Sequence, residues 1–238
     1  MRVKGRAMDL CCAPAQCAGQ DATWLTPVAP LVVCACLDDP DWAEAAAVAP
    51  TVADLLDAEH YTQDGRRGRF LARRSILRTL AARMLGCMAA DVSIAHDAQG
   101  APQLTAPPGQ LHVSVSGRGA LAAFALSPRR IGIDLEPFGD PQPPAWNILH
   151  ARERAWLDGL AGDARHAAFM HIWTVKEAYL KMLGLGLRIE PSDVAVRIEA
   201  NGRAGVAAGG RGRPAAAANC WRTELGGQTV LVACASDL

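Results

Sequence analysis

The sequence predicts a mixed α+β fold built from two halves, each of which combines helices with a small sheet. The first observation is size, because half of the 238 residues are hydrophobic, enough for one large domain or two small lobes. The second is the order of the expected elements, since each half contains a long helix and several short apolar strands. The third is a pair of glycine turns, at 117–119 and 226–227, that each run into an apolar strand. These patterns place the junction of the halves near residues 127–130.

In the first half, an irregular lead-in is expected over residues 1–30. Pro40 with acidic residues just after it favours a helix start, and Gly86 favours the end of a long helix. The expected elements are a strand over 31–37, a helix beginning near 40, a helix over about 68–85, a turn at 100–102 and two strands around 117–119.

In the second half, Gly184 closes the longest helical pattern. The expected elements are a strand over 130–136, a helix over about 152–160, a helix over 166–183, and strands over 193–200, 220–225 and 228–236. The segment 201–218 is mostly Gly, Ala and Arg, a composition that predicts a long loop or a mobile insertion.

The composition narrows the class of protein. Lys plus Arg and Asp plus Glu both number 24, so no global charge points to nucleic acid or to an anionic membrane. No stretch approaches the roughly 20 apolar residues of a membrane span. The eight cysteines include no two Cys-x-x-Cys pairs, which disfavours a zinc site and favours reduced thiols in a cytoplasmic protein.

The strand in RRIGIDLEPFGD, residues 129–140, carries an unusual pair of charges. The period of two places Ile131, Ile133 and Leu135 on one face. Asp134 and Glu136 share the other face with a glycine, and like charges so close repel unless a cation or water separates them. The simplest interpretation of this strand taken alone is a solvated face.

The helix in FMHIWTVKEAYLKML presents two faces. A core stripe at helical spacing consists of Phe169, Ile172, Val175, Tyr179 and Met182. Another face carries Trp173, Glu177 and Lys181 at successive i, i+4 positions. Taken alone, Glu177 and Lys181 would form a surface ion pair, but a large aromatic above them is typical of a covered site.

The earlier long helix is rich in arginine. Arg66, Arg69 and Arg73 project on the side of its apolar stripe, where they must meet an anion or a cleft, or extend to solvent. They form a candidate phosphate grip, since a guanidinium binds phosphate oxygens in a bidentate manner. The flanking Arg67, Arg74 and Arg78 are expected to be solvated.

Together these residues suggest a site for a phosphorylated substrate and a divalent cation. Asp134, Glu136 and Glu177 would supply three hard oxygen ligands, which favour Mg²⁺ over zinc. Lys181, one turn beyond Glu177, would neutralise a phosphoryl group during transfer.

The motifs GAPQL, HVSVSG, GIDLEP and FMHIWTVKEAYLKMLGLGL stand in an order that resembles the two-lobed 4′-phosphopantetheinyl transferases. The resemblance covers roughly residues 66–198, and the last motif is its most specific part. It implies a pseudo-twofold α+β fold in which each lobe packs a helix on a small, mostly antiparallel sheet. The implied lobes are 31–128 and 129–238, in a monomer that binds coenzyme A at their junction.

The resemblance also implies the reaction and the roles of the residues. Such enzymes move phosphopantetheine from coenzyme A to a serine of an apo acyl or peptidyl carrier protein and release 3′,5′-ADP. Asp134, Glu136 and Glu177 would hold Mg²⁺ against the diphosphate, and Lys181 would contact a phosphate or the leaving group. Glu153 would help to activate the serine, or is alternatively a solvated helix residue. The implied coenzyme A contacts are Arg66, Arg69, Arg73, His96, Gly100, Pro102, Ser114, Asp134 and Lys181.

Two positions depart from the family pattern. Val115 stands where the family has a histidine that touches the diphosphate, and Ala101 stands where it has a lysine. These departures leave open a drifted relative that binds a carrier protein or a nucleotide without turnover. A metal-dependent phosphoesterase that uses the same acids is a third possibility, disfavoured by the lack of an obvious second-metal cluster.

Overall fold

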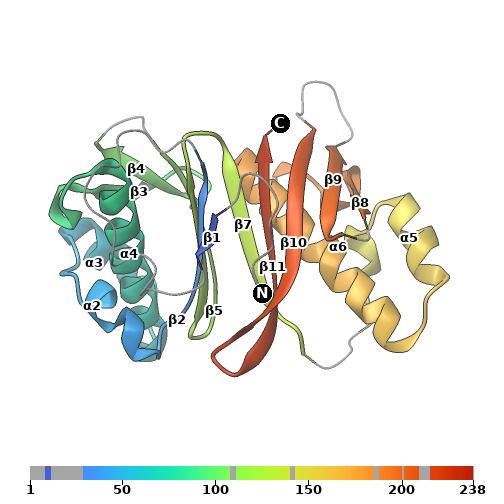
Figure 1. The fold of residues 1–238 in the computed structure, drawn as a ribbon, viewed down its shortest axis with the longest axis horizontal. Helices are drawn as coiled ribbons and strands as arrows, with labels where there is room; N and C mark the ends of the chain where they lie inside the picture. The colour runs from blue at the N-terminus through green and yellow to red at the C-terminus, as the bar shows by residue number, and fades with distance from the viewer. Residues whose placement is uncertain are drawn as a thin grey trace. The chain divides into compact units, whose positions relative to one another are not determined.

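The computed structural model describes residues 9–11, 29–107, 111–139, 143–184, 188–199, 201–208 and 215–237. The chain divides into two compact units, Met1–Arg129 and Arg130–Leu238 (Figure 1). Each unit packs a long helix on a largely antiparallel sheet, so the predicted α+β class is confirmed. Within the described residues, no helix is long and apolar enough to cross a membrane.

The N-terminal unit contains a four-stranded sheet in the order β1-β2-β6-β5 and a separate pair, β3-β4. Its strands are β1 Asp9–Cys11, β2 Leu31–Cys36, β3 Ser93–His96, β4 Pro102–Ala106, β5 His112–Arg118 and β6 Leu121–Ser127. Its helices are η1 Pro40–Trp42, α2 Ala43–Ala46, α3 Val52–Ala58, α4 Asp64–Leu85 and η2 Ala89–Asp91. The three residues of β1 form a strand inside the expected irregular lead-in, whose residues 1–8 and 12–28 lie outside the described part.

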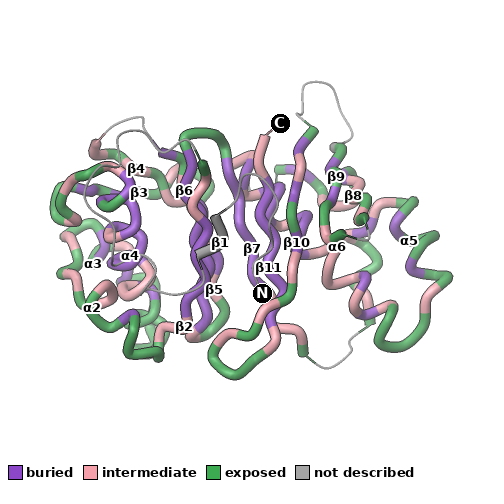
Figure 2. Tube along the Cα trace, viewed as in Figure 1, coloured by how far each residue is buried: buried purple, intermediate pink, exposed green. Residues whose placement is uncertain are grey.

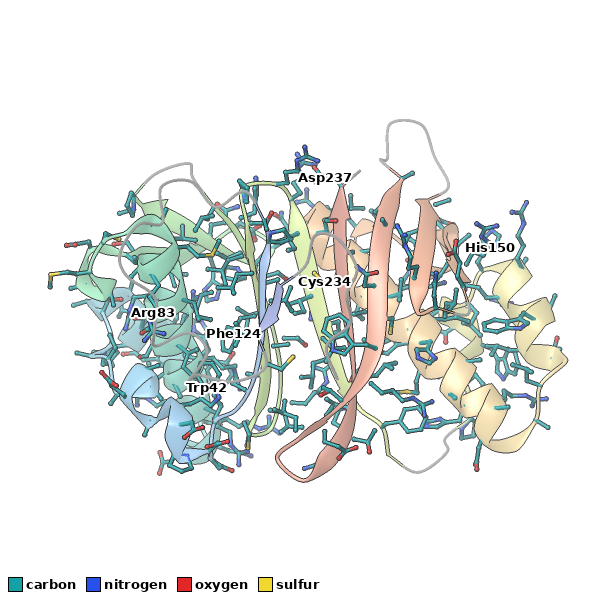
Figure 3. The ribbon with its side chains drawn as sticks, viewed as in Figure 1. Trp42, Arg83, Phe124, His150, Cys234 and Asp237 are labelled. Carbon is teal, nitrogen blue, oxygen red and sulfur yellow. The ribbon has the colours of Figure 1, made fainter. Side chains whose placement is uncertain are left out.

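The core of this unit lies between α4 and the four-stranded sheet. Every residue of β6 is buried, as its apolar sequence requires. Ile76 and Leu80 of α4 cluster with Phe124 of β6 and with Trp42; Phe124 and Trp42 are labelled in Figure 3. The helix starts four residues earlier than predicted and ends before Gly86, whose φ of 66° gives it the expected left-handed cap.

Two arginines of α4 correct the sequence prediction. Arg74 and Arg78 were expected to be solvated, but they are buried, with relative solvent exposures of 4% and 1%. The reason is a set of acids on α3: Arg78 pairs with the buried Asp54, and Arg74 pairs with Asp57 at 3.3 Å. Buried guanidinium groups of this kind are tolerated because they are paired.

The C-terminal unit contains a five-stranded antiparallel sheet in the order β7-β11-β10-β9-β8. Its strands are β7 Ile131–Pro137, β8 Val194–Ile198, β9 Arg203–Ala208, β10 Ala216–Leu225 and β11 Gln228–Asp237. Its helices are η3 Trp146–Ile148, α5 Ala151–Asp158, α6 Gly162–Leu183 and η5 Pro191–Asp193. Figure 1 shows α6 lying along one face of the sheet, and Figure 2 shows β7 and β11 as mostly buried.

The apolar stripe predicted on the second long helix is confirmed. Val175, Tyr179 and Met182 of α6 are buried in one cluster with Leu231 and Ala233 of β11. Ile172 is buried too, in the cluster under α5. The helix begins at Gly162, four residues before its predicted start, and ends before Gly184 as expected.

The segment 201–218 is not the long loop that its composition predicted. It contains β9 and the start of β10, which pair with Ala216 opposite Val206. Ala204, Val206, Ala216 and Ala218 are buried in the core beneath α6. Backbone hydrogen bonds between β9 and β10 hold these strands in place. Bulky side chains are therefore not needed at these positions. Residues 209–214 lie outside the described part.

Gly132 allows α6 to lie unusually close to β7. A Cβ atom at this position would stand 2.0 Å from the carbonyl oxygen of Ala178 and 2.4 Å from the backbone nitrogen of Met182. Only a residue without a side chain permits this approach. Because Asp134 and Glu136 follow Gly132 at a period of two, they lie on the same, helix-facing side of the strand.

We expect Gly132→Ala to lower the free energy of unfolding by about 3 kcal/mol, at the upper end of the cost of overpacking. The added methyl group would meet backbone atoms of α6, which have no rotamer with which to move away. Urea unfolding followed by circular dichroism measures the loss.

Gly205→Ala is the matched control, since a Cβ atom there has no heavy atom within 4 Å. Equal unfolding free energies for the two variants would contradict the close approach of α6 and β7.

Candidate functional site

The face of β7 that carries the two carboxylates is covered by α6, which rules out the solvated face. Asp134 is fully buried, and the ammonium of Lys181 donates to its Oδ1 at 2.6 Å. The indole Nε1 of Trp173 donates to Oε1 of Glu136 at 3.2 Å. The structure therefore brings Asp134 together with Lys181, and Glu136 together with Trp173. We call this line of contacts the α6–β7 seam.

Glu177 completes the seam from the helix side. It lies four residues after Trp173 and four before Lys181, so all three project from one face of α6. All three are partly exposed, in contrast to the buried residues on either side of them. The carboxylates of Asp134, Glu136 and Glu177 thus come from two packed elements, β7 and α6.

The donor set of the seam suits a hard divalent cation. Carboxylate oxygens are the ligands that Mg²⁺ prefers, and Asp134 is a buried carboxylate that already attracts a cation, the Lys181 ammonium. Within the described residues, no three His, Cys, Asp or Glu side chains are already grouped to hold a metal ion. Three carboxylates are ligands of the type that Mg²⁺ prefers. To bind the ion, the side chains of Asp134 and Glu136 would have to turn away from their present partners, Lys181 and Trp173.

Glu153 lies in a buried network next to the seam and is only 2% exposed, so it is not a solvated helix residue. Its Oε2 accepts from the ammonium of Lys176 at 2.7 Å and from the backbone of His150 at 2.8 Å. Its Oε1 accepts from the backbone of Val196 at 2.7 Å. These contacts tie α5, α6 and β8 together, and the assignment of Glu153 to serine activation stays a prediction.

Lys176 has a role that the sequence did not reveal. Its fully buried ammonium also donates to the carbonyl oxygens of Ile148 and Pro191, both at 2.8 Å. Burial lowers the pKa of Lys176, while the hydrogen bond and charge of Glu153 raise it. The residue next to Glu177 in the motif thereby anchors α6 to two other segments.

A second group of predicted residues lies within the N-terminal unit. Arg73, His96 and Pro102 line a cavity of about 190 Å³. Val115 lines it as well, at the position where the family pattern has histidine. The remaining lining residues were missed by the sequence analysis: Tyr61, Phe70, Arg74, Leu77 and Gly117. The sequence offered one signal of this cavity, the aromatic Phe70 among the arginines of α4. In the structure the buried ring of Phe70 stacks on that of Tyr61, with the ring centroids 5.0 Å apart.

The other predicted contacts of this unit are more scattered. Arg66 and Arg69 are exposed at the start of α4, and Ser114 is buried in β5. Gly100 has a φ of 84° in the turn between β3 and β4. The carboxylate of Asp97 stabilises that turn by accepting from the backbone of Gln99 and of Ala101, both at 2.8 Å.

His96 is one of the titratable groups that line the cavity. Its Nδ1 lies 2.9 Å from the carboxylate of Asp57 and 3.2 Å from the guanidinium of Arg74. Burial lowers the pKa of His96 below its ordinary value of 6.5, and the charge of Arg74 lowers it further, against the opposing effect of Asp57.

A comparison with known protein families finds a match in the part of the chain that contains the α6–β7 seam. Residues 130–235 match the model of the 4′-phosphopantetheinyl transferase superfamily. That range contains β7, α6, Asp134, Glu136, Glu177 and Lys181. The resemblance inferred from the motifs is therefore confirmed.

Individual relatives agree with this match. The chain is 34% identical over 151 residues to the 4′-phosphopantetheinyl transferase HetI of Nostoc sp., which covers 60% of this chain and 63% of that protein. It is 28% identical over 135 residues to a 4′-phosphopantetheinyl transferase of Bacillus subtilis, covering 55% and 58%. It is 30% identical over 104 residues to the 4′-phosphopantetheinyl transferase Sfp of the same species, covering 42% and 44%. The alignments thus span less than two thirds of each of these relatives.

We expect Lys176→Met to lower the free energy of unfolding by about 3–5 kcal/mol, because it leaves the buried Glu153 carboxylate without its cation. Arg197→Gln is the control, since that residue belongs to an exposed pair with Glu199 and such pairs contribute about 1 kcal/mol or less. Chemical unfolding of both variants makes the comparison. A cost for Lys176→Met as small as that of the control would refute the anchoring role.

We expect His96 to titrate below pH 6.5 in the folded protein, as followed by its ring resonances in NMR. The unfolded chain then takes up the proton first, so acidification through pH 6.5 lowers the free energy of unfolding. Asp57→Asn lowers the pKa of His96 further, because it removes the group that opposes the shift. A His96 pKa above 6.5 contradicts this arrangement.

Proposed function

We propose that this chain, which matches the 4′-phosphopantetheinyl transferase superfamily over residues 130–235, transfers phosphopantetheine from coenzyme A to a serine hydroxyl of an apo acyl or peptidyl carrier protein. The observation that carries the proposal is the α6–β7 seam, in which three carboxylates and Lys181 lie along one strand and one helix inside the matched range. Relatives that are named as 4′-phosphopantetheinyl transferases support it.

Asp134, Glu136 and Glu177 would hold Mg²⁺. The bound ion would offset the charge of the coenzyme A diphosphate and polarise the phosphorus that is attacked. Lys181 is 30% exposed, so its ammonium has room to exchange Asp134 for a phosphate oxygen. The indole N–H of Trp173 donates to Glu136, and this hydrogen bond would help to orient the carboxylate within the seam.

The reaction is a phosphoryl transfer in which positioning matters more than covalent catalysis. The serine oxygen attacks the β-phosphorus, and the bond from that phosphorus to the bridging oxygen breaks. The 3′,5′-ADP leaves with the bridging oxygen, and Lys181 stabilises the charge that develops on it. The serine proton passes to water or to a nearby base.

The cavity of the N-terminal unit would take part of the nucleotide. Arg73 supplies a guanidinium group to the cavity, which suits a phosphate, whereas the guanidinium of Arg74 is already paired with Asp57. The stacked rings of Tyr61 and Phe70 suit the adenine base. Because the side chain of Val115 offers no hydrogen bond there, we assign to Arg73 the positive charge that the family histidine would otherwise supply.

Coenzyme A and a carrier protein are therefore the proposed partners. The monomeric state and the cytoplasmic location stay predictions from the sequence. Comparing several apo carrier proteins in the following experiment would identify the specific carrier.

The test is intact mass spectrometry of several apo carrier proteins after incubation with this protein, coenzyme A and Mg²⁺. We expect a mass gain of one phosphopantetheine, which EDTA abolishes. Glu177→Ala is expected to reduce the initial rate by about 10²-fold or more, the scale of losing one element of electrostatic stabilisation.

Glu199→Ala is the matched control, because it removes an exposed carboxylate of the same unit and should leave the rate unchanged. No mass gain from a folded protein that still binds coenzyme A would favour the drifted, non-catalytic relative. A mass gain that persists in EDTA and in Glu177→Ala would contradict the metal site.

A further inference from the structure

The ammonium of Lys181 holds the buried carboxylate of the α6–β7 seam. Asp134 is fully buried, and the two groups form an ion pair at 2.6 Å. The side chain of Lys181 is 30% exposed, so part of it faces solvent. A buried carboxylate is costly unless a positive charge compensates it. Lys181 therefore supplies from α6 the positive charge that Asp134 requires on β7.

A metal ion bound by Asp134 would compete with this ammonium. Both are hard cations that seek the same carboxylate oxygens. Even on the second oxygen of Asp134, a metal ion would stand within roughly 5 Å of the ammonium, where two cations in a buried site repel strongly. Lys181 and a metal ion are therefore alternative partners of Asp134.

We propose that Lys181 is the internal counter-ion of the seam and leaves Asp134 when the carboxylates bind Mg²⁺, an inference that rests on the proposed function. Lys181 thereby weakens the binding of Mg²⁺, because its ion pair must break first. The released ammonium becomes a donor for an anion at the exposed side of the seam. Since such coupling is reciprocal, an anion held by Lys181 strengthens the binding of Mg²⁺ by the same factor. The seam then takes up a metal ion and a phosphorylated ligand together.

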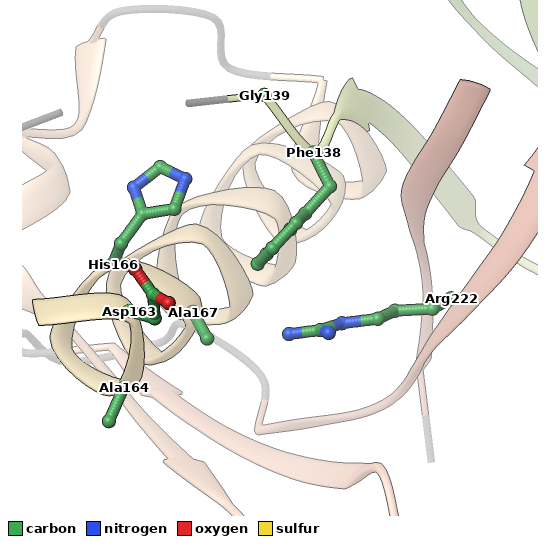
Figure 4. A pocket seen from close by; sticks show the side chains of 7 residues that line it. All are labelled: Phe138, Gly139, Asp163, Ala164, His166, Ala167 and Arg222. Carbon is green, nitrogen blue, oxygen red and sulfur yellow. The ribbon is translucent and has the colours of Figure 1, made fainter. Parts of the chain in front are cut away.

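Arg222 allows this exchange to be distinguished from a general effect of charge. It lies opposite Leu231, and Leu231 lies opposite Glu136, so Arg222 stands on the same face of the sheet, two strands or about 10 Å from Glu136. Its guanidinium lies 4.0 Å from the ring centre of Phe138. Figure 4 shows the two side chains in the wall of a cavity of about 720 Å³ at the beginning of α6. Arg222 is thus a nearby positive charge that lies against a ring.

The first measurement follows the three lysines of the chain, Lys4, Lys176 and Lys181, by NMR of the lysine-labelled full chain. Lys181→Arg identifies the resonance of Lys181. When Mg²⁺ is added without coenzyme A, we expect this resonance to shift saturably. We also expect the ammonium protons of Lys181 to exchange faster with water, because they lose their acceptor. The buried Lys176 is the internal control, since its ammonium donates to Glu153 and to two backbone carbonyls and should not change.

The second measurement is calorimetry of Mg²⁺ binding to the full chain, again without coenzyme A. Lys181→Met is expected to bind Mg²⁺ about tenfold more tightly than the wild type, because no ion pair has to break. Arg222→Gln is the matched control. It removes one positive charge about a Debye length from the carboxylates and is expected to change the affinity less than about twofold.

Equal tightening by Lys181→Met and Arg222→Gln would reduce the effect to the general field of the charges and overturn the exchange. A Lys181 resonance that stays unchanged while the wild type binds Mg²⁺ overturns it too, even where Lys181→Met does not fold. In both cases a carrier protein that is still modified leaves the proposed function standing. If neither the wild type nor Lys181→Met binds Mg²⁺, with or without coenzyme A, the metal site of the proposed function fails together with this inference.

Discussion

The close approach of α6 to β7 at Gly132 is the constraint on which the candidate site depends. Because a Cβ atom there would stand 2.0 Å from a carbonyl oxygen of α6, any other residue would push the helix outward. The contacts beyond Gly132 are short polar ones, 2.6 Å from Lys181 to Asp134 and 3.2 Å from Trp173 to Glu136. Such contacts lose most of their strength when their elements separate by an ångström. The absence of a side chain at Gly132 therefore sets the spacing of four seam residues, Asp134, Glu136, Trp173 and Lys181.

Neighbouring residues of α6 have opposite tasks because successive positions differ by about 100° around the helix. Lys176 points inward, where its ammonium has three protein acceptors and no exposure. Glu177 points to the seam and remains partly exposed. The buried lysine limits the rotation of the helix about its axis, and this limit defines where Glu177 and its neighbours Trp173 and Lys181 project. Lys176 thus shapes the candidate site although its ammonium lies outside the α6–β7 seam.

The sequence predicted features that depend on local spacing. The shared face of Gly132, Asp134 and Glu136, the stripe of α6 and the glycines after both long helices all follow from the period of one element, and the structure confirms them. The failures involve contacts between distant residues. Arg78 is buried because Asp54, 24 positions away, pairs with it, and no pattern within α4 indicates that partner. The alanine-rich β9 has only one of the branched residues that mark a strand, Val206, and the cavity residues Tyr61 and Arg222 have no motif at all.

The proposed function requires that the α6–β7 seam bind Mg²⁺ together with coenzyme A. Trp173 reports on it directly, because its indole N–H donates to Glu136, and an ion bound by that carboxylate must change the hydrogen bond. The measurement is the indole resonance of Trp173 in isotope-labelled protein, distinguished from the five other tryptophans by its absence in Trp173→Phe. We predict a saturable shift when Mg²⁺ is titrated in the presence of coenzyme A. A resonance that stays in place while coenzyme A binds would contradict the account.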